Sequence, residues 1–214
     1  MHEVFENREE AGRRLSRRLE RLRGSGAAVI AIPKSGVPVA ATLAHRLRLE
    51  WNVIIVNKLP VPWNPQASFG ALTADGSFVL NEPMIHGMRL NRRQIDVVVA
   101  RAREAALAQA DLYYRTKPFP DIRSKCVVVL DDGLASGYTM LAAIKSLRTF
   151  SPESIIAASP IASRFASRLI EEAADECVFE QMSASVPFSI SDFYLDRPGL
   201  SYNDIQTALL EVRG

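Results

Sequence analysis

The chain has 214 residues, of which 48% are hydrophobic and 23% are charged, and its formal net charge is +2. This length favours one domain with an ample core, and the small net charge argues against bulk nucleic-acid binding as the main activity. No apolar run approaches the length of a membrane span, and the first residues lack the apolar region of a secretory signal. Cys126 and Cys177 have no metal-ligand spacing and are expected to be small buried residues in a reducing cytoplasm.

The first predicted element is a charged helix over residues 8–23, in which Leu15, Leu19 and Leu22 recur at helical spacing and form the buried stripe. Its many arginines could contact nucleic acid. Interspersed glutamates favour instead a helix face that is simply solvated. The helix is expected to end at Gly24-Ser25-Gly26.

A buried strand is predicted over residues 27–32, followed by a turn and by a helix over 39–49. In an open parallel sheet the ligand crevice lies at the carboxyl ends of the strands. Lys34 in the turn would therefore face the crevice and bind an anionic group, unless it is only a solvated surface lysine. A short strand over 53–56 ends just before Lys58, which would face the same crevice or extend into solvent from a strand end.

Residues 59–125 are expected to form an insertion, in which Pro60, Pro62 and Pro65 break regular structure. Turn residues and apolar patterning then predict a short hairpin and a long helix. In chain order these elements are a turn at Asn64-Pro65-Gln66, strands over 69–73 and 77–80 joined across 74–76, and a helix over 91–114.

The most informative stretch begins with an apolar strand over 127–130 and continues with Asp131 and Asp132. A loop of small residues follows, and then a helix over 138–150. The amides around residues 135–139 can point at one anion, whose charge the helix dipole favours. The carboxylates need other partners, such as sugar hydroxyls or a Mg²⁺ shell. The stretch therefore predicts a site for a phosphorylated sugar with a divalent ion, and it matches neither the P-loop nor the dinucleotide-binding glycine pattern.

Strands and helices continue to alternate after this stretch, which predicts an α/β fold with a parallel sheet covered by helices on both faces. The expected elements are strands over 154–159 and 176–179, a helix over 163–174, an aromatic loop over 187–196 and a final helix over 201–212. Phe188, Phe193 and Tyr194 in the loop are either a platform for a planar base or packing residues.

The stretch from Val127 to Thr139 resembles the signature of the type I phosphoribosyltransferases, with four apolar residues, two acids and a loop ending Ala-Ser-Gly-Tyr-Thr. Ser136 stands where that pattern most often has threonine. The chain is similar to a bacterial and archaeal group with an inserted hairpin and helix, whose acceptor is generally unassigned. The resemblance implies a single domain over 1–214, with the insertion at 59–125 and a hood segment at 180–214.

The resemblance also implies a glycosyltransferase of nucleotide metabolism. It would use Mg²⁺ to move phosphoribose from phosphoribosyl pyrophosphate to a nitrogen acceptor, a nucleobase or related ring, and release pyrophosphate. In that family the two acids hold the ribose hydroxyls and the loop holds the 5′-phosphate, so Asp131 and Asp132 would contact Mg²⁺ only indirectly. The catalytic residues implied are Asp131, Asp132, Lys34 and Lys58. The remaining contacts to phosphoribosyl pyrophosphate would come from Ser35, Gly36, Gly133, Ala135, Ser136, Gly137, Tyr138 and Thr139.

Members of the family carry a mobile basic loop, which closes over the substrate and excludes water. The insertion occupies that position and supplies Arg89, Arg92, Arg93, Arg101 and Arg103, each of which could equally be solvated. His86 is similarly open to both interpretations. Ala135 replaces the further aspartate of the hypoxanthine-guanine enzymes, which disfavours that acceptor and leaves adenine-like, uracil-like, orotate-like or non-standard ones.

Two other functions compete with the transferase hypothesis. The fold could serve as a regulatory sensor of phosphoribosyl pyrophosphate or nucleotides, or the chain could be another sugar-phosphate enzyme that shares only the loop. The resemblance suggests a homodimer, without identifying an interface. Cysteine usage, the lack of a long apolar run and the small net charge predict a cytoplasmic protein with no membrane partner and disfavour nucleic acid as a partner.

Overall fold

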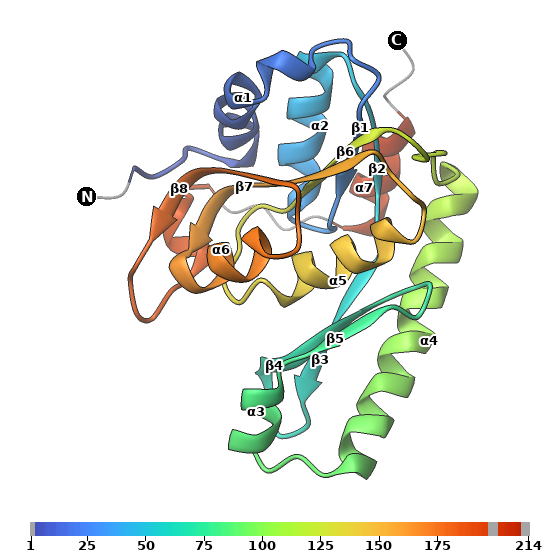
Figure 1. The fold of residues 1–214 in the computed structure, drawn as a ribbon, viewed down its shortest axis with the longest axis vertical. Helices are drawn as coiled ribbons and strands as arrows, with labels where there is room; N and C mark the ends of the chain where they lie inside the picture. Colours follow the sequence, from blue (N-terminus) through green and yellow to red (C-terminus); the bar gives the residue numbers. More distant parts are fainter. Residues whose placement is uncertain (1–2, 197–200, 211–214) are drawn as a thin grey trace.

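The protein, seen in a computed structural model, is described over residues 3–196 and 201–210. Its centre is a parallel five-stranded sheet in the order β2-β1-β6-β7-β8 (Figure 1). The strands are β1 (Ala28–Ala31), β2 (Glu50–Val53), β6 (Cys126–Leu130), β7 (Ser154–Ser163) and β8 (Glu176–Ser183). The predicted α/β fold with a parallel sheet is confirmed.

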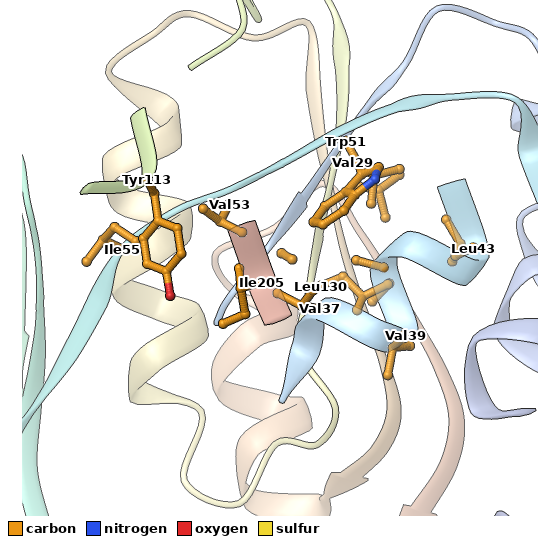
Figure 2. Close-up of a cluster of buried hydrophobic side chains, with 14 of the residues drawn as sticks. Val29, Val37, Val39, Leu43, Trp51, Val53, Ile55, Tyr113, Leu130 and Ile205 are labelled. Atoms are coloured by element: carbon orange, nitrogen blue, oxygen red, sulfur yellow. The ribbon is translucent and has the colours of Figure 1, made fainter. Parts of the chain in front are cut away.

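Helices cover both faces of this sheet, because alternate side chains of its apolar strands point to opposite sides. Val29 and Leu130 belong to a core that includes side chains of α1 (Arg8–Arg18), α2 (Gly36–Leu47) and α7 (Tyr202–Leu210) (Figure 2). Ile30 and Val129 face the opposite core, which includes α5 (Tyr138–Arg148) and α6 (Arg164–Glu171). The sheet is therefore the middle layer of three. The loops that follow the carboxyl ends of its strands lie along one edge of this layer, where a parallel sheet usually binds ligands.

The N-terminal helix is shorter than the predicted 8–23, since α1 ends at Arg18 and a 3₁₀ turn, η1 (Glu20–Leu22), follows it. The reason is local: the backbone at Leu19 leaves the helical region, with φ −107° and ψ 17°. Leu15 and Leu19 are fully buried, as the helical spacing predicted.

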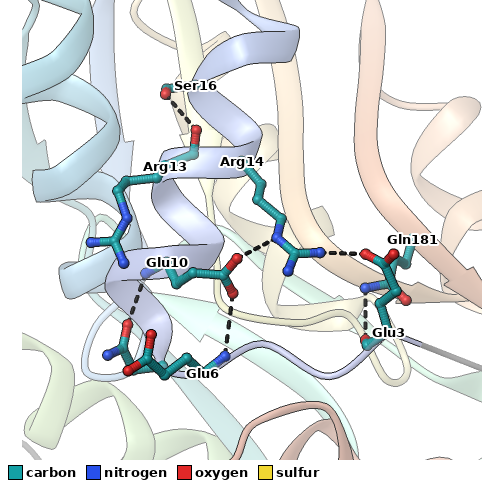
Figure 3. Close-up of polar contacts among 8 residues, drawn as sticks. Glu3, Glu6, Glu10, Arg13, Arg14, Ser16 and Gln181 are labelled. Atoms are coloured by element: carbon teal, nitrogen blue, oxygen red, sulfur yellow. Dashed lines mark hydrogen bonds and ion pairs between the residues drawn. The ribbon is translucent and has the colours of Figure 1, made fainter.

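The segment before α1 is tied to α1 and to β8 (Figure 3). The Arg14 guanidinium contacts the carboxylates of both Glu10 and Glu3. From β8, the Gln181 amide donates to the Glu3 carbonyl oxygen at 2.8 Å. These contacts hold Glu3 against α1 and β8. At least one arginine of α1, Arg14, is therefore paired with carboxylates of the same chain.

The insertion forms a separate antiparallel sheet in the order β3-β4-β5, followed by two helices. Its elements are β3 (Val56–Val61), β4 (Asn64–Thr73), β5 (Phe78–Leu80), α3 (Glu82–Gly87) and α4 (Arg92–Thr116). Figure 1 shows the hairpin and α4 side by side, extending away from the main sheet. No helix in the described ranges is both long and apolar enough to cross a membrane.

The prediction that prolines break regular structure in the insertion is wrong for two of the three. Pro60 lies in β3 and Pro65 in β4, and the turn falls at Pro62-Trp63 instead of Asn64-Pro65-Gln66. Both prolines are tolerated because proline, which has no N–H to donate, can lie where a strand has no neighbour on one side. Pro60 lies in β3, an edge strand with a register shift at this residue. Pro65 lies in the part of β4 that does not pair with β5, since β5 pairs only with residues 70–72.

The expected strand over 53–56 is also wrong, because the chain leaves the main sheet at Val53 and enters β3 at Val56. Lys58 therefore lies within β3, opposite Ala71 of β4, and does not follow a strand of the parallel sheet. The hairpin of β4 and β5 and the long helix α4 occur where the sequence predicted them. The last two residues of the predicted helix 201–212 lie outside the described residues.

The segment after β8 returns across the sheet and pairs with the N-terminus. Phe5 and Tyr194 form a parallel bridge, in which the Phe5 N–H donates to the Phe193 carbonyl at 2.8 Å and the Leu195 N–H donates to the Phe5 carbonyl at 2.9 Å. A short 3₁₀ helix, η2 (Ile190–Phe193), precedes this contact. Within the expected hood at 180–214, residues 184–196 are called the hood segment from here on.

Candidate functional site

Two loops leave neighbouring strands at the same edge of the sheet. Ala31 of β1 pairs with Leu130 of β6, and the Ile32 N–H donates to the Leu130 carbonyl at 2.8 Å. The loops that follow, residues 33–35 and 131–137, therefore start side by side. They are the two loops in which the sequence places most of its candidate residues.

The second loop leads into α5 through Gly137, whose φ of +80° is a conformation that favours glycine. Gly137 gives α5 no capping side chain, and the first turn of α5 contains no acidic residue. The amides at this helix N-terminus are thus available to an anion, which the helix dipole also favours. Ala135 and Ser136 are exposed in front of it, while Tyr138 and Thr139 are half-buried.

Hydrogen bonds to β7 fix the shape of this loop. Leu134 donates its N–H to the Ile161 carbonyl at 2.8 Å and accepts from the Ser163 N–H at 2.8 Å. The Ser163 hydroxyl donates to the Ala135 carbonyl at 2.7 Å and accepts from the Ala166 N–H at 3.0 Å. The loop is thus preorganised by backbone contacts that leave its exposed tip unobstructed.

Asp131 lies at the junction of the two loops and is half-buried. Its Oδ1 accepts the Asp132 N–H at 2.8 Å. Burial, followed by the neighbouring charge of Asp132, raises the pKa of Asp131 well above its usual value, whereas the charge of Lys58 acts in the opposite direction. Lys58 in β3 is therefore close enough to the carboxylate to influence its charge, although it does not follow a strand of the main sheet.

Asp132 faces a different environment and is only 4% exposed. Its Oδ2 accepts a hydrogen bond from Arg8 Nε at 2.9 Å and forms an ion pair with Arg8 Nη2 at 2.8 Å. The Tyr194 hydroxyl donates to the Asp132 carbonyl oxygen at 2.6 Å. Nothing in the spacing of Arg8 distinguishes it from the other arginines of α1, so the sequence does not predict this contact.

The first loop presents Lys34 as an exposed residue, followed by half-buried Ser35 at the start of α2. The peptide bond between Pro33 and Lys34 is cis. Gly36 lies close to Asp131, since a Cβ added at Gly36 would be 3.3 Å from the Asp131 Oδ1, and the start of α2 is therefore beside the signature carboxylate. The structure therefore brings together Gly36, Asp131 and the loop that carries Lys34.

A cavity of about 690 Å³ lies between β3 and α4. It is lined by two of the five insertion arginines, Arg93 and Arg101, together with Lys58, Asn57 and apolar residues including Val97. Within the described ranges, none of these three cations forms an ion pair. A mixed apolar and cationic lining of this size suits an anionic ligand with an apolar part.

The other insertion residues do not share this cavity. Arg92 pairs with Asp96 at 2.9 Å, and Arg89 and Arg103 are exposed. Exposed His86 has its Nδ1 2.8 Å from the Glu82 carbonyl within α3. The exposure of these four side chains agrees with the prediction that they are solvated, which is one of the two interpretations of the sequence.

The aromatic residues of the hood segment are mainly packing residues. Phe193 and Tyr194 are 5% and 1% exposed, and Phe5 packs on Tyr194 with ring centroids 5.5 Å apart. Phe188, which is half-buried, packs on Phe193 at 5.6 Å. For Phe193 and Tyr194 the packing interpretation is therefore the correct one, and neither ring is open as a platform for a base.

The hood segment sits directly on the signature loop. A Cβ atom added at Gly133 would lie 2.6 Å from Cγ2 of Ile190.

The chain matches the family described as the phosphoribosyl transferase domain over residues 3–197. This chain belongs to that family. The resemblance drawn from the signature stretch is confirmed.

Two sets of relatives agree with this assignment. A Mycobacterium tuberculosis protein provisionally named a phosphoribosyl transferase, Rv0571c in strain H37Rv and MT0597 in strain CDC 1551, is 34% identical over 158 residues. The match spans 74% of this chain and 36% of the relative, so the chain covers about a third of that protein's length. The solved structure of TT1426 from Thermus thermophilus is 30% identical, with a TM-score of 0.80, over 99% of this chain and 100% of that one.

The structure also bears on metals and cysteines. Over residues 3–196 and 201–210, no group of three or more His, Cys, Asp or Glu side chains is placed to hold a metal ion. Cys126 and Cys177 are free and half-buried, so they are less enclosed than the sequence suggested. Burial raises the pKa of the Cys177 thiol to about 11, which keeps it in the unreactive protonated form.

Proposed function

We propose that this member of the phosphoribosyl transferase family is an active transferase. It would break the bond from C1 of phosphoribosyl pyrophosphate to diphosphate, and form a bond from C1 to a ring nitrogen that loses its proton. One observation supports this most: the uncapped N-terminus of α5, Asp131 and the loop carrying Lys34 lie at one edge of the sheet.

The 5′-phosphate is assigned to the tip of the signature loop. Residues 135–139 provide backbone amides at a helix N-terminus without a competing acid, and Ser136 and Thr139 add hydroxyl donors. Gly133 and Gly137 belong to the same loop, and Tyr138 begins the helix. This end of the site would fix the sugar by its phosphate while C1 reacts elsewhere.

The ribose is assigned to Asp131 and Asp132, whose oxygens can accept hydrogen bonds from its hydroxyls. Carboxylate oxygens are also the ligand class that Mg²⁺ prefers, and Mg²⁺ is usually bound through one or two carboxylates, water and substrate oxygens. Asp131 and Asp132 fit this pattern, with Mg²⁺ held beside them through the ribose hydroxyls or water. When bound, the ion would neutralise charge on the diphosphate.

The departing diphosphate is assigned to Lys34, Ser35, Gly36 and Lys58. Two cations and the backbone amides there would stabilise the negative charge that grows as the C1–O bond breaks. The protein needs to supply little covalent chemistry, because positioning of the donor and acceptor and charge stabilisation carry the reaction. Burial, followed by the charge of Asp132, raises the pKa of Asp131, which disfavours a second full negative charge beside the anionic substrate.

Two features of the site bear on the acceptor. Ala135 offers no carboxylate to a base nitrogen, so a 6-oxopurine acceptor bound in that manner is disfavoured. The buried rings of Phe193 and Tyr194 do not supply a stacking platform. A nitrogen-containing ring of another type, adenine-like, uracil-like or orotate-like, is the acceptor class that we propose. A homodimer is the further expectation from family resemblance, and a cytoplasmic location is the expectation from cysteine usage.

The test is a panel of bases incubated with phosphoribosyl pyrophosphate and Mg²⁺, with pyrophosphate release as the readout. Release that depends on one base supports the transferase and names its acceptor. Tight binding of phosphoribosyl pyrophosphate without release for any base would favour the regulatory sensor. Absence of binding would reject both.

A further inference from the structure

An ion pair joins the N-terminal helix to the signature loop. Arg8, the first residue of α1, contacts Asp132 through Nε at 2.9 Å and Nη2 at 2.8 Å. The two side chains are 15% and 6% exposed, which makes this the most shielded ion pair among the described residues. Shielding from solvent strengthens the interaction, because salt and water screen such a pair weakly.

Tyr194 of the hood segment completes this contact. Its hydroxyl donates to the Asp132 carbonyl oxygen at 2.6 Å, and the Arg8 guanidinium lies over its ring, 4.9 Å from the centroid. Burial raises the pKa of Tyr194, so the hydroxyl keeps its proton and remains a donor. Asp132 is therefore held at its side chain by one segment and at its backbone by another.

The two segments that hold Asp132 are joined to each other. Phe5, three residues before Arg8, exchanges backbone hydrogen bonds with Phe193 and Leu195, on either side of Tyr194. Arg8 thus belongs to the same local assembly as Tyr194, and the assembly reaches the site from the N-terminus and the hood segment together.

The contact geometry favours orientation of Asp132 over stabilisation of the fold. Both Arg8 contacts go to Oδ2, so the guanidinium does not occupy Oδ1. Arg8 Nη1 is buried and has no hydrogen-bond partner within the described part of the chain. A buried nitrogen without a partner reduces what an ion pair adds to stability.

We propose that Arg8 is a positioning residue of the ribose site. It fixes the rotamer of Asp132 so that Oδ1 accepts a hydrogen bond from a ribose hydroxyl, and it offsets the carboxylate charge that would otherwise repel an anionic sugar phosphate. This inference rests on the proposed function, since the orientation of Asp132 matters only if this residue binds ribose.

The test compares two ligands by isothermal titration calorimetry of the full chain with Mg²⁺. Phosphoribosyl pyrophosphate engages the ribose site, whereas inorganic pyrophosphate has no hydroxyls and reports only the diphosphate end. Arg8→Gln should weaken phosphoribosyl pyrophosphate at least about tenfold and leave pyrophosphate within about twofold. Arg8→Lys should recover part of the affinity, because one charged donor to Oδ2 is retained. Arg13→Gln, at an exposed position of the same helix, is the control and should match the parent.

Two results would overturn the inference. One is an unchanged affinity for phosphoribosyl pyrophosphate in Arg8→Gln while the parent binds it. The other is an equal loss of both ligands with a lower melting temperature, because that pattern means that Arg8 only supports the fold. A parent protein that fails to bind phosphoribosyl pyrophosphate would instead reject the proposed function itself, and the role of Arg8 with it.

Discussion

Gly36 and Asp131 face each other across the two loops of the site, with too little space between them for a side chain at residue 36. A Cβ atom at residue 36 would lie 3.1 Å from the Asp131 Cα and 3.3 Å from its Oδ1. It would also lie 3.1 Å from the Leu130 carbonyl oxygen, so most of the obstruction is backbone that cannot easily move. The loop carrying Lys34 therefore has a fixed position relative to the signature carboxylates.

Gly36→Ala should destabilise the protein by about 1–3 kcal/mol, because an extra methyl group must displace packed backbone. It should also weaken binding of phosphoribosyl pyrophosphate, because the two loops separate. Urea unfolding measures the first effect. Gly87→Ala in α3 is the matched control, since a Cβ there meets nothing within 4 Å and alanine favours a helix. Equal stability of the two variants would show that the loops tolerate a side chain at their junction.

The free energy of unfolding should depend on pH in part through the protonation of Asp131. Because burial and Asp132 raise its pKa, the native state binds more protons than the unfolded chain above about pH 4. The free energy of unfolding contributed by this residue therefore falls as the pH rises from the unfolded pKa through the folded one. Asp131→Asn should flatten this part of the pH profile, as measured by urea unfolding between about pH 4.5 and about pH 7.5. Parallel pH profiles for parent and variant would mean that folding does not raise the pKa of Asp131.

Asp75 of the insertion is hydrogen-bonded to α5, the helix that follows the signature loop. The Ser146 hydroxyl of α5 donates to Asp75 Oδ2 at 2.9 Å, and Ser146 is buried. Burial acts to raise the pKa of Asp75, but hydrogen bonds from Thr73, Ser77 and Ser146 outweigh it and lower the pKa.

Ser146→Ala should therefore cost about 1 kcal/mol near neutral pH. The cost should shrink on acidification, because the stability that an acid with a depressed pKa contributes is present above its unfolded pKa and is lost as the pH falls through the folded one. Chemical unfolding of parent and variant at neutral pH and at about pH 3 measures both. A cost that does not change with pH would indicate that the hydroxyl does not serve the ionised carboxylate.

The cavity between β3 and α4 should help to bind the anionic substrate. Arg101 lines it together with Lys58, whereas Arg103, also exposed on α4, is not part of its lining. Arg101→Gln should lower the affinity for pyrophosphate about twofold to fivefold, the range expected for one solvent-exposed cation. Arg103→Gln should leave it unchanged. An equal effect of both substitutions in a titration would mean that only the overall charge matters.

The sequence predicted the parallel sheet and the signature loop well because both depend on local patterns. The apolar run of 127–130, two acids and small residues before a helix form a signal within thirteen positions. The hairpin of β4 and β5 was similarly visible from the turn at 74–76. These elements need no long-range contact to be recognised.

The sequence could not predict the features that depend on distant pairing. Pro60 and Pro65 look like breaks, yet an edge strand and a strand paired on one side accommodate them. Arg8 meets Asp132 only because the hood segment brings the N-terminus to the end of β6, 124 residues away in the chain. One arginine among several in α1 carries no local mark of such a contact.

The central claim is that the acids after β6 and the amides before α5 bind opposite ends of one pentose phosphate. Titration of phosphoribosyl pyrophosphate with Mg²⁺ into the parent and into the double variant Asp131→Asn, Asp132→Asn tests it most directly, with circular dichroism and a melting curve to show that both are folded. We predict saturable binding to the parent and none to the folded double variant. Equal affinity of the two proteins would contradict the assignment of the carboxylates.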